Sequence, residues 1–175
     1  MDVQFRRSGT RRYGVTILRP GLPPFTKDPA PGFDEYLPHD LIHFIVEREL
    51  GLTQGIFGQV AAGGTGGTFL PEDSESLTTR EASRRQRSLS KRSEKLMRAG
   101  RRDTAASEEA VYVVHNEWKL RRSGKATPPA VSGAKNSNRI TTDQIARMCD
   151  ELDELSQKWV ALKIGEAITL TWPKS

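Results

Sequence analysis

The sequence contains few of the residues that form disulfides and metal-binding sites. Cysteine occurs once and histidine three times among the 175 residues. The single Cys149 excludes an intramolecular disulfide and a cysteine-rich zinc site, and it suits a reducing compartment. A metal site in this chain would therefore use imidazole and carboxylate ligands.

Long apolar runs are missing as well. Hydrophobic residues make up 35% of the chain, which predicts a modest core. No segment approaches the ~20 apolar residues that a membrane helix requires, and the first residues contain no apolar stretch of signal-peptide length. We therefore expect a cytoplasmic protein without a membrane partner, folded as a single domain over residues 1–175.

Alternating apolar residues at the two ends of the chain predict strands. Residues 1–19 have the pattern of a β-hairpin with a turn near Gly9. Residues 168–172 alternate apolar and polar side chains and predict a last strand. Helices are expected between these ends. The expected fold is α+β, a small antiparallel sheet of the N-terminal hairpin and the C-terminal strand packed against several helices, with the two termini close together.

Composition and apolar patterning predict further features of the central chain. Six prolines in residues 20–38 indicate a loop without regular structure. Residues 38–50 predict a largely buried helix, followed by a short second one. Residues 104–120 predict another helix, although the run at 111–114 would also suit a strand. Residues 121–139 have the composition of a flexible linker.

His39 and His43 lie four residues apart in the first of these helices, so their side chains point the same way. Such a pair can bind one metal ion, as in the zinc-binding HExxH helix. Glu47, one turn further on, or His115, from another helix, could complete a site for zinc or another divalent metal. If the protein is an enzyme, we predict metal-assisted hydrolysis with Asp40 activating a bound water.

The segment HDLIH at 39–43 resembles the HDxxH motif of a ubiquinone-biosynthesis protein family that is thought to bind zinc. The resemblance implies metal binding by His39 and His43 and carries over Asp40. That family has a glutamate twelve residues after the second histidine, and Gly55 occupies this position here. Residues 38–64 also resemble a block, PHDLxHFxVExELGLxxGIFGQxAAGG, of small bacterial proteins without an assigned activity.

A structural role is the alternative for these residues. His39 would then flank the start of a helix, and His43 would be hydrogen-bonded in the core to Asp40 or Glu47. The glycine cluster that follows has the spacing of a phosphate-binding loop from Gly58 onward. However, Gly64 occupies the lysine position, so we interpret the cluster as a glycine-rich loop after a helix end.

Positive charge is concentrated in residues 77–102, which we expect to be helical. This segment contains ten Lys or Arg residues and only two acidic residues, which gives it a local charge of +8. Such a helix could bind nucleic acid through phosphate contacts, while the absence of aromatic residues argues against stacking on single strands. Two alternatives remain open: a solvated helix, and an acidic partner such as the acidic side of the last helix, within one subunit or across a homodimer.

Overall fold

The computed structural model describes residues 1–72, 78–124 and 140–173, so most of the predicted linker lies outside the described residues. In the described residues three strands come first, followed by two helices, a two-residue strand, three helices and a last strand. In order they are β1 (Asp2–Gly9), β2 (Arg12–Arg19), β3 (Leu22–Lys27), α1 (His39–Glu49), α2 (Ile56–Ala61), β4 (Leu70–Pro71), α3 (Thr79–Ala99), α4 (Arg101–Arg122), α5 (Thr142–Ala161) and β5 (Ala167–Thr171).

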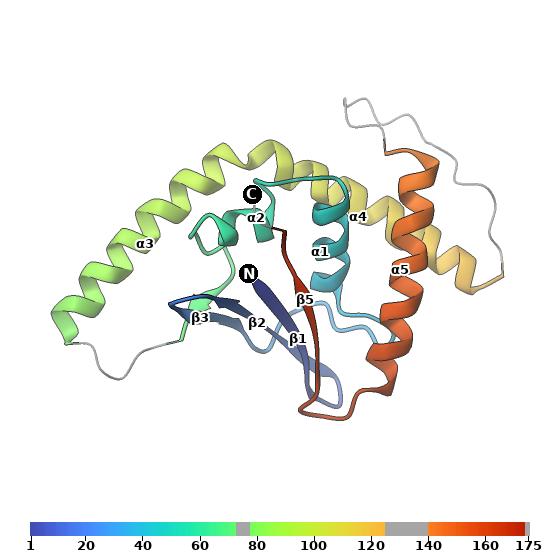
Figure 1. The fold of residues 1–175 in the computed structure, drawn as a ribbon, viewed down its shortest axis with the longest axis horizontal. Coiled ribbons are helices and arrows are strands. Elements are labelled where there is room, and N and C mark those ends of the chain that lie inside the picture. The colour runs from blue at the N-terminus through green and yellow to red at the C-terminus, as the bar shows by residue number, and fades with distance from the viewer. Residues whose placement is uncertain (73–77, 125–139, 174–175) are drawn as a thin grey trace.

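The strands form one antiparallel sheet in the order β4-β3-β2-β1-β5. The alternation that predicts the hairpin also sets its register, with Phe5 of β1 opposite Val15 of β2 and Ile168 of β5. These three side chains face the core and are buried. The C-terminal strand therefore lies beside the N-terminal one, which confirms the α+β prediction and brings the termini together (Figure 1).

The structure corrects the prediction of a loop over residues 20–38, because β3 forms inside it. Pro23 and Pro24 have no partners in the β2–β3 ladder. They lie where its register shifts, between Ile17 and Arg19 of β2. A strand tolerates proline at such an irregularity because no ladder hydrogen bond needs its missing N–H. The two-residue strand β4 then pairs with β3 from a segment that carries no strand pattern.

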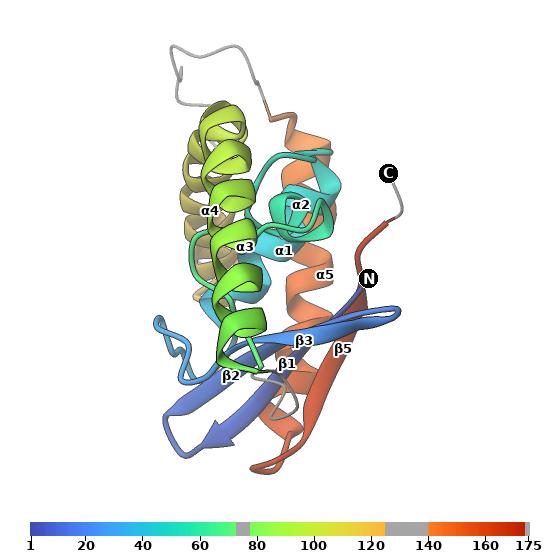
Figure 2. The same ribbon diagram turned by 90° about the vertical axis from the view of Figure 1, so that its left-hand side faces the viewer.

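Helix α1 is the central helix, and all its residues from Asp40 to Glu47 are buried. It packs against α2, α4 and α5 (Figure 1), and together with α4 it lies on one side of the sheet (Figure 2). The rings of Phe44 and of Phe5 in the sheet pack edge to face, with their centroids 6.0 Å apart. In the same way Trp159 of α5 meets Tyr13 of β2 at 6.3 Å. The prediction of a buried first helix is thus confirmed.

Helices α3 and α4 form one long arm that bends at Gly100 (Figure 1). The expected basic helix is therefore present, and residues 111–114 are helical within α4. Only Ser93 is buried among residues 80–99, while Leu89 and Leu96 are half-buried. The N-terminal half of α3 thus has almost no packing partner. None of the described helices is long and apolar enough to cross a membrane.

Candidate functional site

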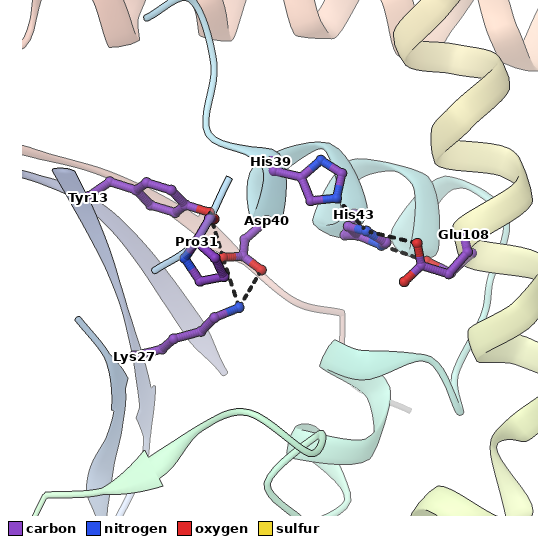
Figure 3. Close-up of polar contacts among 8 residues, drawn as sticks. Tyr13, Lys27, Pro31, His39, Asp40, His43 and Glu108 are labelled. Atoms are coloured by element: carbon purple, nitrogen blue, oxygen red, sulfur yellow. Dashed lines mark hydrogen bonds and ion pairs between the residues drawn. The ribbon is translucent and has the colours of Figure 1, made fainter. Parts of the chain in front are cut away.

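His39 and His43 meet at the N-terminal end of α1, as the sequence predicts (Figure 3). Their Nε2 atoms are 3.2 Å apart and their rings are nearly perpendicular. Nδ1 of His43 lies 3.0 Å from the hydroxyl of Ser107 in α4, which donates its hydrogen to Glu47. His43 therefore donates through Nδ1 and accepts through Nε2 from His39. The result is a continuous hydrogen-bonded chain from the half-buried His39 to a fully buried carboxylate.

Glu47 is the last member of this hydrogen-bonded chain, and it caps the N-terminus of α2. Its carboxylate oxygens accept hydrogen bonds from the backbone N–H groups of Ile56 and Phe57, each at 2.9 Å, and from Ser107 at 3.0 Å. A Cβ at Gly55 would lie 2.5 Å from the Glu47 carboxyl carbon, so only glycine permits this approach. Glu47 thus caps α2, and Ser107 separates its carboxylate from the imidazole pair.

Asp40, the predicted general base, faces the sheet (Figure 3). Its carboxylate lies 2.9 Å from Nζ of Lys27 and 2.7 Å from the hydroxyl of Tyr13. Burial and the Asp40 charge raise the pKa of Tyr13, which keeps the phenol neutral. Asp40 therefore joins α1 to β2 and β3, and its side chain points away from His39 and His43.

His115 lies on α4 outside the hydrogen-bonded chain. Its ring stacks on Trp118, and its Nε2 is buried without a partner in the described residues. Glu108, also on α4, lies near the pair, with its Oε2 3.8 Å from Nε2 of His43. The described residues contain no group of three or more His, Cys, Asp or Glu side chains placed to hold a metal ion. The structure thus brings together two of the four predicted ligands, and metal binding stays a prediction.

Sequence reasoning missed Ser107, which links the imidazole pair to Glu47. Ser107 shares one face of α4 with Val111, Val114 and Trp118, because these residues recur every three or four positions. All four are buried. A serine on an otherwise apolar helix face was therefore the signal, since a buried hydroxyl requires polar partners.

The His43–Glu47 chain predicts two opposing pH dependences. Burial lowers the pKa of His43 from 6.5 to about 4 and raises that of Glu47 from 4.5 to about 7. Between pH 4 and 6.5 the unfolded chain binds a proton at His43 that the folded chain lacks, so this group adds stability as pH rises. Between pH 4.5 and 7 the folded chain keeps the Glu47 proton that the unfolded chain has lost, so this group removes stability as pH rises.

Urea unfolding in EDTA at several pH values separates the two contributions. The free energy of unfolding of the wild type minus that of His43→Asn should rise by about 3 kcal/mol from pH 4 to 6.5, and the same difference for Glu47→Gln should fall by about 3 kcal/mol from pH 4.5 to 7. If both differences change in the same direction, the assigned protonation states are wrong.

The second charged feature of the structure is a row of bases on α3. At about 100° per residue, six of its eight bases fall within an arc of about 80° on the solvent side of the helix. All six are exposed. We call this row the basic stripe; it consists of Arg80, Arg84, Arg87, Lys91, Lys95 and Arg98.

No carboxylate of the described residues forms an ion pair with the basic stripe. The acidic side of α5 is used elsewhere. Glu151 pairs with Arg48 of α1, and Asp150 pairs with Arg121 of α4. Figure 1 shows α5 at the opposite end of the molecule from α3. The alternative in which the acidic side of α5 pairs with the basic helix is therefore not formed within the described chain.

Comparisons of the chain with protein-family models, with curated protein sequences and with solved structures give no match. The geometry of the two sites is thus the basis for inferring a function.

Proposed function

We propose that this protein binds the phosphate backbone of duplex nucleic acid through the basic stripe of α3. The observation that carries the proposal is the placement of six exposed bases in one row on a helix of 21 residues. Bases of the stripe that are three or four residues apart repel one another along the helix. A nucleic acid lying along the row neutralises these charges, and the counterions condensed on its phosphates are released.

Phosphate fits the stripe better than an acidic protein does. Six of the eight bases in α3 are arginine, whose planar guanidinium group binds phosphate oxygens in pairs. Protein interfaces need an apolar centre, yet Met97 is the one large apolar side chain of α3 that is exposed. A helix about 10–12 Å across also matches the roughly 12 Å major groove of B-form DNA.

Fluorescence anisotropy with five labelled probes tests the proposal. Two 20-base-pair DNA duplexes of unrelated sequence should bind with similar affinity, because phosphate contacts carry no sequence information. A single strand of the same length should bind more weakly, since α3 offers no aromatic platform. Duplex RNA tests whether the major groove is needed. Polyglutamate that binds as tightly as the duplexes would show an acidic protein to be the partner instead.

As a second candidate function we propose that His39 and His43 bind one divalent transition-metal ion. The supporting observation is the 3.2 Å between their Nε2 atoms, which approaches the roughly 3.4 Å between two nitrogens that coordinate one tetrahedral zinc. Such an ion would polarise a bound water molecule. The two imidazoles would hold the ion, while Ser107 fixes the ring of His43.

Metal analysis of protein purified without a histidine tag tests this second function. We expect close to one zinc per chain after addition of zinc and dialysis, and close to none in the His43→Asn variant. The His115→Asn variant is the control, because it removes an imidazole that takes no part in the pair. A wild-type stoichiometry near zero would rule the metal function out.

A further inference from the structure

An open pocket of about 520 Å³ lies beside α3, outside the basic stripe except at Arg84. Its walls come from three parts of the chain that are distant in sequence: the β2–β3 turn, the glycine-rich loop after α2, and one side of α3. Four arginines line it, namely Arg19, Arg84, Arg85 and Arg92. Glu81 is the one acidic residue among the lining residues. The pocket therefore has a strongly positive wall.

Arg19 is the arginine that the sheet contributes. Its guanidinium carbon lies 3.9 Å from the centre of the Phe25 ring, so one face of the group is packed against the strand beside it. Nη1 reaches the carbonyl of Val60 at 3.5 Å, and Nε is buried without a partner in the described chain. Burial, and then the charges of Arg85 and Arg92, lower the pKa of Arg19. Arg19 is thus a fixed cation whose hydrogen-bonding capacity is only partly used.

Arg92 is held in place from the opposite wall. Its Nη2 donates to the carbonyl of Ala62 at 2.5 Å. Gly63 makes this possible, since its φ is +88° and a Cβ there would lie 2.9 Å from the Arg92 guanidinium carbon. The glycine cluster that resembles a phosphate-binding loop in sequence thus plays a different part. It holds Arg92 of α3 beside the pocket through the carbonyl of Ala62.

The positive wall has little compensation within the chain. Glu81 is already engaged at the start of α3, where its Oε2 accepts hydrogen bonds from the backbone N–H and the hydroxyl of Thr78. No ion pair joins the four arginines to a carboxylate of the described residues. Cations of like charge brought together around a pocket favour an anion at their centre.

We propose that this pocket is a second binding site, which takes a small phosphorylated ligand of about mononucleotide size. Arg19, Arg85 and Arg92 contact its phosphate groups. The net charge of the wall suits a phosphate monoester or a pyrophosphate, with two or more negative charges, better than a phosphodiester with one. The volume exceeds that of phosphate alone and lies in the usual range of small-molecule sites. Leu22, Phe25 and Leu89 provide an apolar wall for the rest of the ligand.

Isothermal titration calorimetry with inorganic pyrophosphate, adenosine 5′-diphosphate and adenosine tests this proposal. We expect one site for the two phosphorylated probes, no binding of adenosine, and tighter binding of adenosine 5′-diphosphate than of pyrophosphate. Arg19→Met and Arg85→Gln should each weaken binding of both phosphorylated probes roughly tenfold or more, as expected for loss of a charge-assisted contact. Arg85 is exposed, so its variant is informative even if Arg19→Met fails to fold.

Arg87→Gln is the matched control, because it removes the same charge from the same helix but does not line the pocket. It should leave binding of the phosphorylated probes unchanged and weaken duplex binding, whereas the Arg19 variant should do the reverse. The pocket proposal fails if neither probe binds at millimolar concentration, or if Arg87→Gln weakens their binding as much as Arg85→Gln. Neither outcome depends on whether the stripe binds a duplex.

Discussion

Replacing Glu47 with alanine is expected to lower the free energy of unfolding by about 3–5 kcal/mol. The carboxylate accepts hydrogen bonds from Ile56, Phe57 and Ser107, and Glu47 is completely buried. Alanine leaves three donors without an acceptor and opens a cavity against Gly55. Urea unfolding followed by far-UV circular dichroism measures the loss at pH 7.

Glu49→Ala is the control for this prediction, because it shortens the same residue type two positions further along α1. Glu49 pairs with Arg147 at 2.7 Å near the surface, and such a pair contributes less than about 1 kcal/mol. If the two variants are destabilised equally, Glu47 does not cap α2 in the way described. Glu47→Gln should fall between them at pH 7, since it keeps an acceptor oxygen.

Neutralising Arg87, Lys91 and Lys95 together by glutamine is expected to weaken duplex binding roughly 100-fold or more at 0.1 M salt. These three bases are consecutive members of the basic stripe and do not line the arginine pocket. Each one that neutralises a phosphate displaces most of a counterion, so the loss grows with the number of charges removed. Fluorescence anisotropy with one of the DNA duplexes gives the affinities.

A triple variant of Arg11, Lys158 and Lys163 to glutamine controls for net charge. These bases are exposed and far along the sequence from α3: Arg11 lies in the β1–β2 turn, Lys158 in α5 and Lys163 between α5 and β5. If binding depends on the stripe, this variant retains the wild-type affinity within a few-fold. Equal losses in the two triple variants would show that overall charge attracts the duplex and that α3 has no special part.

Local patterns predicted the parts of the fold that depend on local interactions. The hairpin follows from alternation over a few residues. Thr141, followed three positions later by Gln144, has the spacing of the capping box that forms at the start of α5. The burial of α1 follows from apolar residues around most of its circumference. The proline-rich strand β3 could not be predicted in this way, because its pairing depends on a register shift in β2.

The candidate site shows the same division. The approach of His39 to His43 follows from their spacing of four residues on one helix. The partners of Asp40, Glu47 and Arg19 come from other elements, so nothing in their immediate sequence indicates them. Contacts across elements decided which carboxylates are structural and which arginines converge.

The salt dependence of duplex binding tests the central proposal most directly. If all six bases of the stripe contact phosphates, a plot of log K against log salt concentration has a slope of about −5 for the wild type. The triple variant of Arg87, Lys91 and Lys95 should reduce that slope to about −3 or less steep, and the control variant should leave it unchanged. A wild-type slope near zero, or the same slope in all three proteins, would contradict the proposal.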